Sequence, residues 1–445
     1  MTAQVDDVSS GGRTRRSLAT RAAALVALCS LTAGCFLFGD EADEMGVVWD
    51  TPADPKAEEQ GNGAWLSGDT LVRSRFDAVS GYNARDGKRT WEYVPPGRSA
   101  ICRVAADTKS SVLVLTRDGD GATASAKGRG CATDVALDMK NGRELWRAPQ
   151  SVAESRLDES PVMSVGGGIA VDVKGSDLRA VDVRTGKPRW KAALPKGCVP
   201  GTPAVAERRV AALLACGGTA EPRYGEKIPT DAELHVAAFA PGSGALLWSA
   251  PLGGRLAIPW DAEARFVSAD PVVVAASQGG GSGAGAYLSF GSNGRPNPPI
   301  DFSGPYGQIQ SEDRLTAAVD DRRLYTLTFH RVRNSRVDAY RVTTFDLATG
   351  ELLWGGTVDD DRLGRRTAYH ILPQDGKLTV LTVPVRGDRR LYVLDAATGE
   401  QRDAHSFPEG HDSVDTVFAY EDWLIGARYG AATEPSKPFT AYKRP

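Results

Sequence analysis

The chain has 445 residues, of which 24% are charged and 41% are hydrophobic. This composition is typical of a globular protein and excludes a disordered or fibrous chain. The formal net charge of −3 gives no basic excess, which argues against a dedicated nucleic-acid binder. The length usually indicates several domains, but one domain built from repeats reaches the same length.

Residues 1–34 are predicted to be an export signal. Four arginines between residues 13 and 21 precede an apolar run over residues 22–31, which is too short to span a bilayer. Leu31-Thr32-Ala33-Gly34-Cys35 then resembles a bacterial lipobox, whose cysteine becomes the lipidated N-terminus. We therefore expect a lipid on Cys35, anchoring at the extracytoplasmic face of the cell membrane, and an acidic tether over residues 35–45. A plain cleaved signal with an incidental Cys35 is the alternative, and Arg15-Arg16 leaves Sec and twin-arginine export both open.

Four further cysteines are predicted to form disulfides, because an even number in an exported chain is typical of them. Three pairings are possible, and the sequence favours the local one. Cys198 and Cys216 are equidistant from a polar turn at residue 207, so a hairpin there would place them nearly opposite each other. Cys102 and Cys131 bracket an apolar strand at 111–116 and a Gly-rich segment. A metal site is the alternative, but no C-x-x-C occurs and no His lies near these cysteines.

An internal repeat is the most informative feature of the sequence. Residues 160–194 contain four short segments with apolar alternation, at 162–165, 168–173, 178–182 and around Trp190, separated by Gly turns. This pattern predicts a four-stranded antiparallel meander. One such sheet cannot bury both of its faces alone, so several copies must stack.

The end of this unit recurs along the chain as a turn followed by a tryptophan. The fullest copy is Ala180-x-Asp182-x-x-Thr185-Gly186-x-x-x-Trp190, and in five copies the Trp stands four residues after the Gly. Asp and Thr cap a tight turn, Gly supplies its positive φ, and the Trp buries a large face against the neighbouring sheet. We therefore assign a structural docking role, and no ligand-binding role, to Trp49, Trp91, Trp146, Trp190, Trp248 and Trp354. Two degenerate copies carry Asp403 and Pro298 in the Trp position.

These positions recur about every 50 residues and predict an all-β fold, an eight-bladed β-propeller of four-stranded antiparallel sheets over residues 46–445. The first strand, around Trp49, has no preceding repeat. The last repeat has only three strands, at 416–420, 422–427 and 438–442. The N-terminal strand would then complete the C-terminal blade and close the ring without open edges. The count falls to seven if the copy near Gly294 merges with its neighbour.

This pattern resembles the PQQ-like (quinoprotein-type) β-propeller repeat, whose blades carry an A-x-D-x-x-T-G-x-x-x-W docking motif. The resemblance covers nearly all of residues 46–445. It raises the hypothesis of a quinone dehydrogenase, in which a Trp and a disulfide of two adjacent cysteines sandwich the cofactor. No two cysteines are adjacent in this chain. We therefore predict no cofactor, no catalytic residue and no enzyme activity.

Other candidate sites have simpler interpretations. His405 and His411 bracket Glu409, and Asp359–Asp361 is a run of acids, but a solvated loop explains each group better than a metal site. Residues 279–285 are rich in Gly and Ser without the Lys of a phosphate-binding loop, which indicates a hairpin tip. The longest connections, 118–130 and 217–231, are where binding specificity is expected. No metal site is predicted.

The sequence thus predicts a lipid-anchored, extracytoplasmic protein whose propeller is a binding or scaffolding module. Its partner would be a protein or a cell-envelope ligand, with no nucleic acid. A similar propeller serves as an outer-membrane assembly lipoprotein in Gram-negative bacteria. Here arginine supplies 40 of the 53 basic residues, a bias typical of a GC-rich genome such as that of an actinobacterium, which favours a different partner. A sensor of a small ligand or glycan is the alternative, and a PQQ-dependent dehydrogenase is the third.

Overall fold

The structure is a computed structural model. It describes residues 42–54, 61–118, 131–149, 163–217, 232–253, 258, 262–277, 285–309, 316–331, 338–357, 366–384, 389–411, 414–430 and 436–443. Contacts divide the chain into two units, Met1–Phe36 and Leu37–Pro445. The predicted signal at residues 1–34 and the predicted lipidation site at Cys35 lie outside the described residues.

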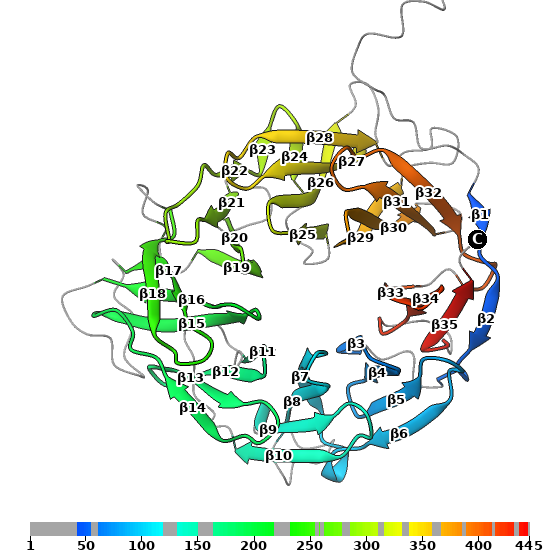
Figure 1. The fold of residues 1–445 in the computed structure, drawn as a ribbon, viewed down its shortest axis with the longest axis horizontal. Helices are drawn as coiled ribbons and strands as arrows, with labels where there is room; N and C mark the ends of the chain where they lie inside the picture. The colour runs from blue at the N-terminus through cyan, green and yellow to red at the C-terminus, as the bar shows by residue number, and fades with distance from the viewer. Residues whose placement is uncertain are drawn as a thin grey trace, which may run out of the picture. The chain divides into compact units, whose positions relative to one another are not determined.

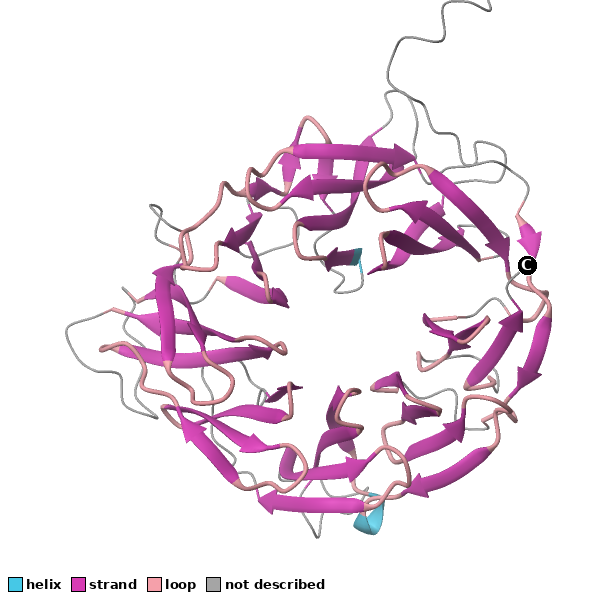
Figure 2. Ribbon diagram, viewed as in Figure 1, coloured by secondary structure: helices cyan, strands magenta, loops and turns pink. Residues whose placement is uncertain are grey.

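The second unit is built almost entirely of antiparallel sheets that follow one another around a ring (Figure 1). Strands make up nearly all of its regular structure (Figure 2), and a short 3-10 turn, η1, occupies Pro96–Arg98. The described residues contain no helix long and apolar enough to cross a membrane. Eight sheets are present, so the chain forms an eight-bladed β-propeller, as the repeat spacing predicts.

Blades 1 to 4 each contain four strands in chain order. Blade 1 consists of β3 (Gly63–Ser67), β4 (Thr70–Ser74), β5 (Val79–Asn83) and β6 (Arg89–Tyr93). Blade 2 consists of β7 (Ile101–Asp107), β8 (Val112–Asp118), β9 (Cys131–Asp138) and β10 (Glu144–Pro149). Blade 3 consists of β11 (Met163–Gly166), β12 (Ile169–Lys174), β13 (Asp177–Asp182) and β14 (Pro188–Lys191). Blade 4 consists of β15 (Cys198–Val205), β16 (Val210–Cys216), β17 (Glu233–Phe239) and β18 (Leu246–Pro251).

Blades 5 to 8 follow the same plan with local departures. Blade 5 consists of β19 (Glu263–Ala269), β20 (Val272–Ser277), β21 (Gly285–Phe290) and β22 (Ile300–Asp301). Blade 6 consists of β23 (Ser303–Gly304), β24 (Gly307–Ile309), β25 (Ala317–Val319), β26 (Arg323–Arg331), β27 (Asp338–Asp346) and β28 (Leu352–Thr357). Blade 7 consists of β29 (Arg366–Gln374), β30 (Lys377–Pro384), β31 (Arg390–Asp395) and β32 (Gln401–Ser406). Blade 8 consists of β33 (Thr416–Tyr420), β34 (Trp423–Ala427), β35 (Phe439–Lys443) and β2 (Val47–Asp50).

Blade 6 differs from the predicted four strands because its inner part is divided. β24 and β25 both pair with β26, and β23 adds to β24. β24 ends at Ile309 and β25 begins at Ala317, so two short strands share the edge that one strand provides elsewhere. The blade count is unaffected.

The N-terminal strand closes the ring as the sequence predicts. β2 pairs antiparallel with β35, with Trp49 opposite Ala441. A second strand, β1 (Asp43–Glu44), pairs parallel with β32 of blade 7, and Met45 between β1 and β2 is 1% exposed. The predicted tether at 35–45 is therefore too long, because residues 43–45 belong to the propeller. The N-terminal segment joins blade 7 to blade 8.

The core lies between the blades, because both faces of each sheet are buried. In β16 the run Val210–Cys216 alternates: Val210, Ala212 and Leu214 face a cluster shared with blade 3, while Ala211 and Leu213 face one shared with blade 5. Eight such clusters each join two neighbouring blades, and one of them joins blade 8 to blade 1. Period-2 patterning with apolar residues in both phases thus produces stacked, doubly buried sheets.

A β-bulge precedes the docking position in every blade except blade 5. In blade 1 the register moves from Gly81 opposite Trp91 to Tyr82 opposite Arg89, which leaves Thr90 unpaired. The same shift leaves one residue unpaired in the other six blades, at Leu145, Arg189, Leu247, Leu353, Arg402 and Val48. A bulge re-aims the side chains that follow it, which turns the Trp toward the next blade.

Strand order gives the propeller two unlike faces. Within each meander, the turn from the first to the second strand and the turn from the third to the fourth lie on one face, which we call the turn face. In blade 1 these are residues 68–69 and 84–88, and the amide of Ala84 donates to the carbonyl of Asp69 between them. The other two connections of each blade lie on the opposite face, which we call the loop face. It carries the longer connections, including 94–100 and 407–415.

Candidate interaction surfaces

The docking tryptophans are used in contacts between blades. A β-carbon placed on the turn Gly of the next blade would lie within 3 Å of a Trp in six places, namely Trp49 at Gly87, Trp91 at Gly142, Trp146 at Gly186, Trp190 at Gly244, Trp248 at Gly294 and Trp354 at Gly399. Four of these indoles also donate to a carbonyl of the next blade: Trp91 to Met139, Trp146 to Val183, Trp190 to Pro241 and Trp354 to Ala396. These contacts occupy one face of each ring.

The two degenerate copies replace the Trp contact differently. Pro298 lies against Gly350 of blade 6, where a β-carbon would stand 3.4 Å from the Pro298 Cβ atom. In blade 7, Asp403 lies 3.0 Å from the Nε2 atom of His405. Blade 8 is completed by the chain's N-terminal strand, so no third-to-fourth turn faces Asp403, and Met45 packs between blades 7 and 8.

The described structure joins Cys102 to Cys131 and Cys198 to Cys216, which is the local pairing that the sequence favours. Cys198 and Cys216 are direct partners across β15 and β16. Cys131 begins β9 and Cys216 ends β16, so each disulfide fixes a strand end that borders one of the long connections. Most of those two connections, which the sequence marks for binding, lies outside the described residues.

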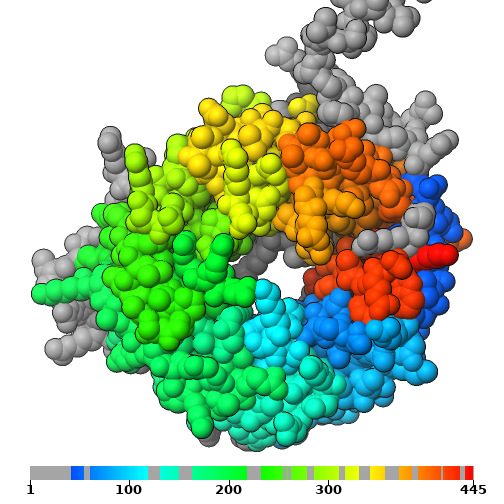
Figure 3. Space-filling model, in the orientation of Figure 1, coloured from blue at the N-terminus to red at the C-terminus, as the bar shows by residue number. Residues whose placement is uncertain are grey.

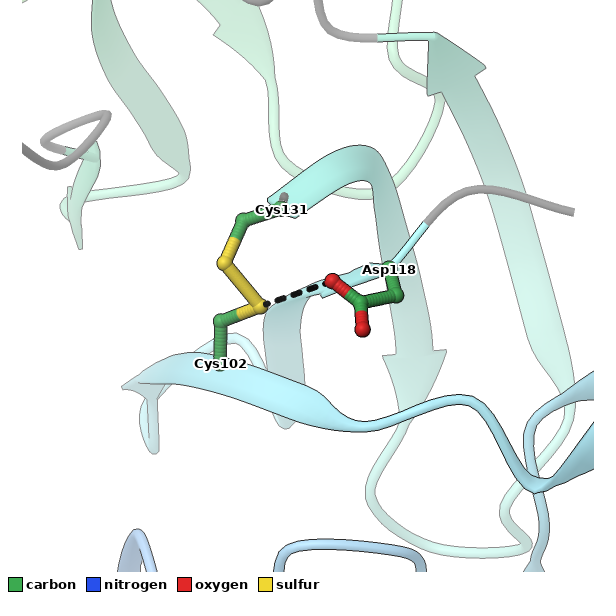
Figure 4. Close-up of side chains that lie close together, drawn as sticks. All are labelled: Cys102, Asp118 and Cys131. Carbon is green, nitrogen blue, oxygen red and sulfur yellow. Dashed lines mark hydrogen bonds between the residues drawn. A yellow bond between two sulfur atoms is a disulfide. The ribbon is translucent and has the colours of Figure 1, made fainter. Parts of the chain in front are cut away.

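One cluster in the part of the chain that the structure describes has the spacing of metal ligands. It contains Cys102, Asp118 and Cys131, drawn in Figure 4, and the Asp118 Oδ1 atom is 3.9 Å from the Cys102 Sγ atom. Both sulfur atoms belong to one disulfide, so neither can act as a thiolate ligand, and the Cys102 sulfur has no proton to donate. The group is a disulfide with a neighbouring carboxylate.

The two histidines assigned to a solvated loop are instead packed into the blade 7 and blade 8 region, so that interpretation is wrong. His405 is in β32 and is 3% exposed. His411 Nε2 lies 3.1 Å from Asp50 Oδ2, and its carbonyl accepts hydrogen bonds from Arg428 and Tyr442. Asp50 is on β2, so this contact ties the N-terminal strand to the C-terminal blade. The Asp359–Asp361 run lies outside the described residues, as does all of the 279–285 segment except Gly285.

Asp50 is the centre of this seam. Lys437 Nζ lies 2.5 Å from its carboxylate, and Thr440 donates to it at 2.7 Å. Burial acts to raise the pKa of Asp50, but hydrogen bonds from Lys437, Thr440 and His411 outweigh it and hold that pKa below its ordinary value. The charged carboxylate therefore stabilises the closed ring.

Charged side chains of the turn face pair across blades. Arg85 of blade 1 lies 2.9 Å from Glu421 of blade 8, and Arg184 of blade 3 lies 2.9 Å from Asp138 of blade 2. Lys109 of blade 2 pairs with Glu207 of blade 4. Each exposed pair contributes little stability on its own. Together they join blade 1 to blade 8, blade 2 to blade 3 and blade 2 to blade 4 across this face.

A known protein family matches most of the sequence. The sequence matches the family model described as "Outer membrane protein assembly factor BamB" over residues 42–221 and 232–417. The chain is a member of the BamB family. Its PQQ-like propeller repeat, inferred from the docking motif, is thereby confirmed. No curated protein matches the sequence.

Solved structures share the fold of this BamB-family chain at low identity. BamB from Moraxella catarrhalis is 14% identical, over 90% of this chain and 100% of that one, with a TM-score of 0.49. A europium-containing methanol dehydrogenase is 12% identical, over 89% and 92% of the two chains, with a TM-score of 0.50. A eukaryotic initiation factor is 10% identical over the same shares, with a TM-score of 0.51. Proteins of such different activity show that this likeness concerns fold alone.

The residues of this BamB-family chain do not fit a quinone cofactor held as in the dehydrogenases. That arrangement needs a disulfide between adjacent cysteines, whereas the two disulfides here join residues separated by 29 and 18 positions. The six docking tryptophans lie against turn glycines, so none offers a free stacking face on that side. No step of a quinone reaction follows from this structure.

A hollow lies at the centre of the ring in the view of Figure 3.

Proposed function

We propose that this protein is an extracytoplasmic lipoprotein, anchored through a lipid on Cys35, whose propeller holds a partner protein or cell-envelope ligand without catalysing a reaction. The match to the BamB family over most of the chain carries the proposal, because the family description names an assembly factor of an outer membrane. The two disulfides support an oxidising compartment outside the cytoplasm. The sequence of residues 1–35 supports export and lipidation.

The loop face is the proposed side for the partner. Several ion pairs on the turn face already join one blade to another, as with Arg85 and Glu421. The loop face carries the longer connections, and specificity in propellers and other scaffolds resides in such connections. Disulfides at two of these strand ends hold the scaffold rigid there.

Two measurements test these points separately. Mass spectrometry of the mature protein is expected to find a lipid-modified N-terminal Cys35, and Cys35→Ser should release the protein from membranes. A mature N-terminus elsewhere would overturn the anchor and leave the binding role standing.

To find the partner, a photo-crosslinking residue replaces Lys196 of the loop face or Asp422 of the turn face, and the protein is cross-linked in intact cells. Both positions are exposed. We expect the Lys196 probe to capture one defined envelope component and the Asp422 probe to miss it. Capture from Asp422 alone would place the partner on the turn face and would contradict the proposed loop-face contact.

A further inference from the structure

Seven of the eight blades have an equivalent residue in the outer strand, so the chemistry of this residue can be compared between blades. It is the bulged residue immediately before the docking position, and it is exposed in every one of these blades except blade 2. Blades 3 and 7 carry Arg189 and Arg402 there, and blade 1 carries Thr90. Blades 4 and 6 carry Leu247 and Leu353, which are 53% and 45% exposed. Blade 2 carries the half-buried Leu145 at this position and blade 8 carries Val48, which is 42% exposed, so the position is polar in three blades and apolar in four.

The residue before the bulge repeats the contrast. Leu246 and Leu352 are 40% and 49% exposed, and Val47 of blade 8 is 40% exposed. Blades 1 and 2 carry Arg89 and Glu144 at this position. Between blades 4 and 6, blade 5 exposes Pro298 and Pro299. We call these six residues the apolar wall: Leu246, Leu247, Pro298, Pro299, Leu352 and Leu353.

Contacts between blades link the three parts of the apolar wall. Trp248, next to Leu247, lies against Gly294 in the turn between β21 and β22 of blade 5. Pro298 in turn lies against Gly350, two residues before Leu352. The wall therefore lies on the outer strands of three consecutive blades.

Charge is sparse on the outer parts of blades 4 and 6. The stretch 240–253 of blade 4 has no charged residue, 347–357 of blade 6 has only Glu351, and 291–301 of blade 5 has Arg295 and Asp301. In blade 3, the much shorter stretch 183–191 contains Arg184, Lys187, Arg189 and Lys191. Loss of charge together with contiguous exposed apolar residues marks a contact surface.

The outer edge of blade 6 is unprotected against strand pairing. Among the described residues β28 pairs only with β27, which leaves its other edge without a strand there. Its sequence, Leu-Leu-Trp-Gly-Gly-Thr, has no charge and no proline. Outer strands β6, β10, β14 and β32 contain charged residues, and β10, β14 and β18 contain proline. Charges and prolines are the usual means of blocking edge-to-edge association.

We propose that the apolar wall is the contact at which two copies of this chain meet, with their β28 edges side by side. In a two-fold contact the residues nearest the axis meet their own copies, so a charge on an edge that pairs with itself would face a like charge. The wall over blades 4 to 6 avoids this conflict, and the basic outer wall of blade 3 does not. The first two strands of the described chain, β1 and β2, pair with blades 7 and 8 and not with the blades of the wall (Figure 1).

The test compares matched variants at one structural position. Leu353→Arg and Leu247→Arg introduce the residue that blades 3 and 7 carry at the bulge, so the fold should tolerate them. Thr90→Arg makes the same change on blade 1, outside the wall. Sedimentation velocity of the mature full-length protein over a wide concentration range should show a reversible dimer. Each leucine variant should weaken it by roughly a hundredfold, because an unpaired charge is then buried in the contact, while Thr90→Arg leaves it unchanged.

A second readout does not depend on the arginine variants. With Leu353→Cys, a short thiol-reactive cross-linker should give a covalent dimer, and with Thr90→Cys it should not. A monomer at every concentration would overturn the proposal. So would a dimer that both leucine variants leave intact. If the protein stays monomeric, floats with vesicles, and loses this flotation in Leu353→Arg, the wall binds lipid. If it stays monomeric and forms a complex with another protein that Leu353→Arg abolishes, the wall binds that protein. Either result contradicts the two-copy contact.

Discussion

The indole ring of Trp91 lies so close to Gly142 of the next blade that a β-carbon at Gly142 would stand 2.4 Å from the Trp91 Cε3 atom. Gly142 also has φ of 69°. Two separate demands therefore fall on one residue: a left-handed backbone and room for an aromatic ring. The recurrence of this pair around the ring explains why Gly and Trp repeat at fixed spacing.

Gly142→Ala should destabilise the protein by about 3 kcal/mol or more, the strain of a positive φ plus the clash with the ring. Gly376→Ala is the matched control, because its φ is 74° and its β-carbon would meet nothing within 4 Å. That variant should cost only about 1 kcal/mol. Urea unfolding measures both. Equal costs would show that the Trp contact contributes nothing beyond the turn itself.

The closing seam should weaken in acid. The folded-state pKa of Asp50 lies below the ordinary value of 3.8, so its charge stabilises the fold above about pH 4, and that contribution is lost as the pH falls through the folded pKa. Asp50→Asn should lower the free energy of unfolding by about 1–2 kcal/mol at pH 7. The gap between wild type and variant should close as the pH approaches the folded pKa.

Asp86→Asn provides the comparison for Asp50, since Asp86 pairs with Lys88 of its own turn and joins no blades. Its replacement should change stability little at any pH. Unfolding curves across pH distinguish the two positions. A gap for Asp50→Asn that stays constant down to strongly acidic pH would refute the charge-based account of closure.

Removing either disulfide should cost about 3 kcal/mol, because each closes a loop of moderate length in the unfolded chain. The double variants Cys102→Ala with Cys131→Ala, and Cys198→Ala with Cys216→Ala, isolate the two bonds. Calorimetry then gives the loss for each. Unchanged melting temperatures in both variants would mean that the bonds do not constrain the unfolded state as supposed.

Met45 should behave as a core residue although it lies in the N-terminal segment. It is 1% exposed between blades 7 and 8, and Met45→Ala should cost about 2–4 kcal/mol. Val47→Ala, at a side chain that is 40% exposed on β2, should cost less than about 1 kcal/mol. Thermal unfolding compares them. Similar small losses for both would show that blades 7 and 8 do not rely on this residue.

Local chemistry explains what the sequence could predict. The strands around Trp190 and the turn glycines follow from patterns within one repeat. The ring closure by Trp49 follows from counting strands, because the last repeat lacks one strand and the first strand has no repeat of its own. The sequence also predicted the local disulfide pairing, because Cys198 and Cys216 are symmetric about a turn.

Features that depend on distant residues escaped prediction. Asp50 and His411 are 361 positions apart, and only the closed ring brings them together. β1 has two residues and no apolar alternation, so it looked like part of a tether. The bulge before the Trp was also missed, although comparison of copies could have revealed it: the same position holds Arg in two blades and Leu in three others.

We propose above that this propeller binds a partner protein or cell-envelope ligand without quinone chemistry. The most direct test is a calorimetric titration of PQQ, with Ca²⁺ present, into the mature full-length protein. We expect no saturable heat, because the chain lacks adjacent cysteines and its docking tryptophans pack against turn glycines. Saturable binding in the micromolar range would contradict the claim and make an alcohol or sugar dehydrogenase the leading function.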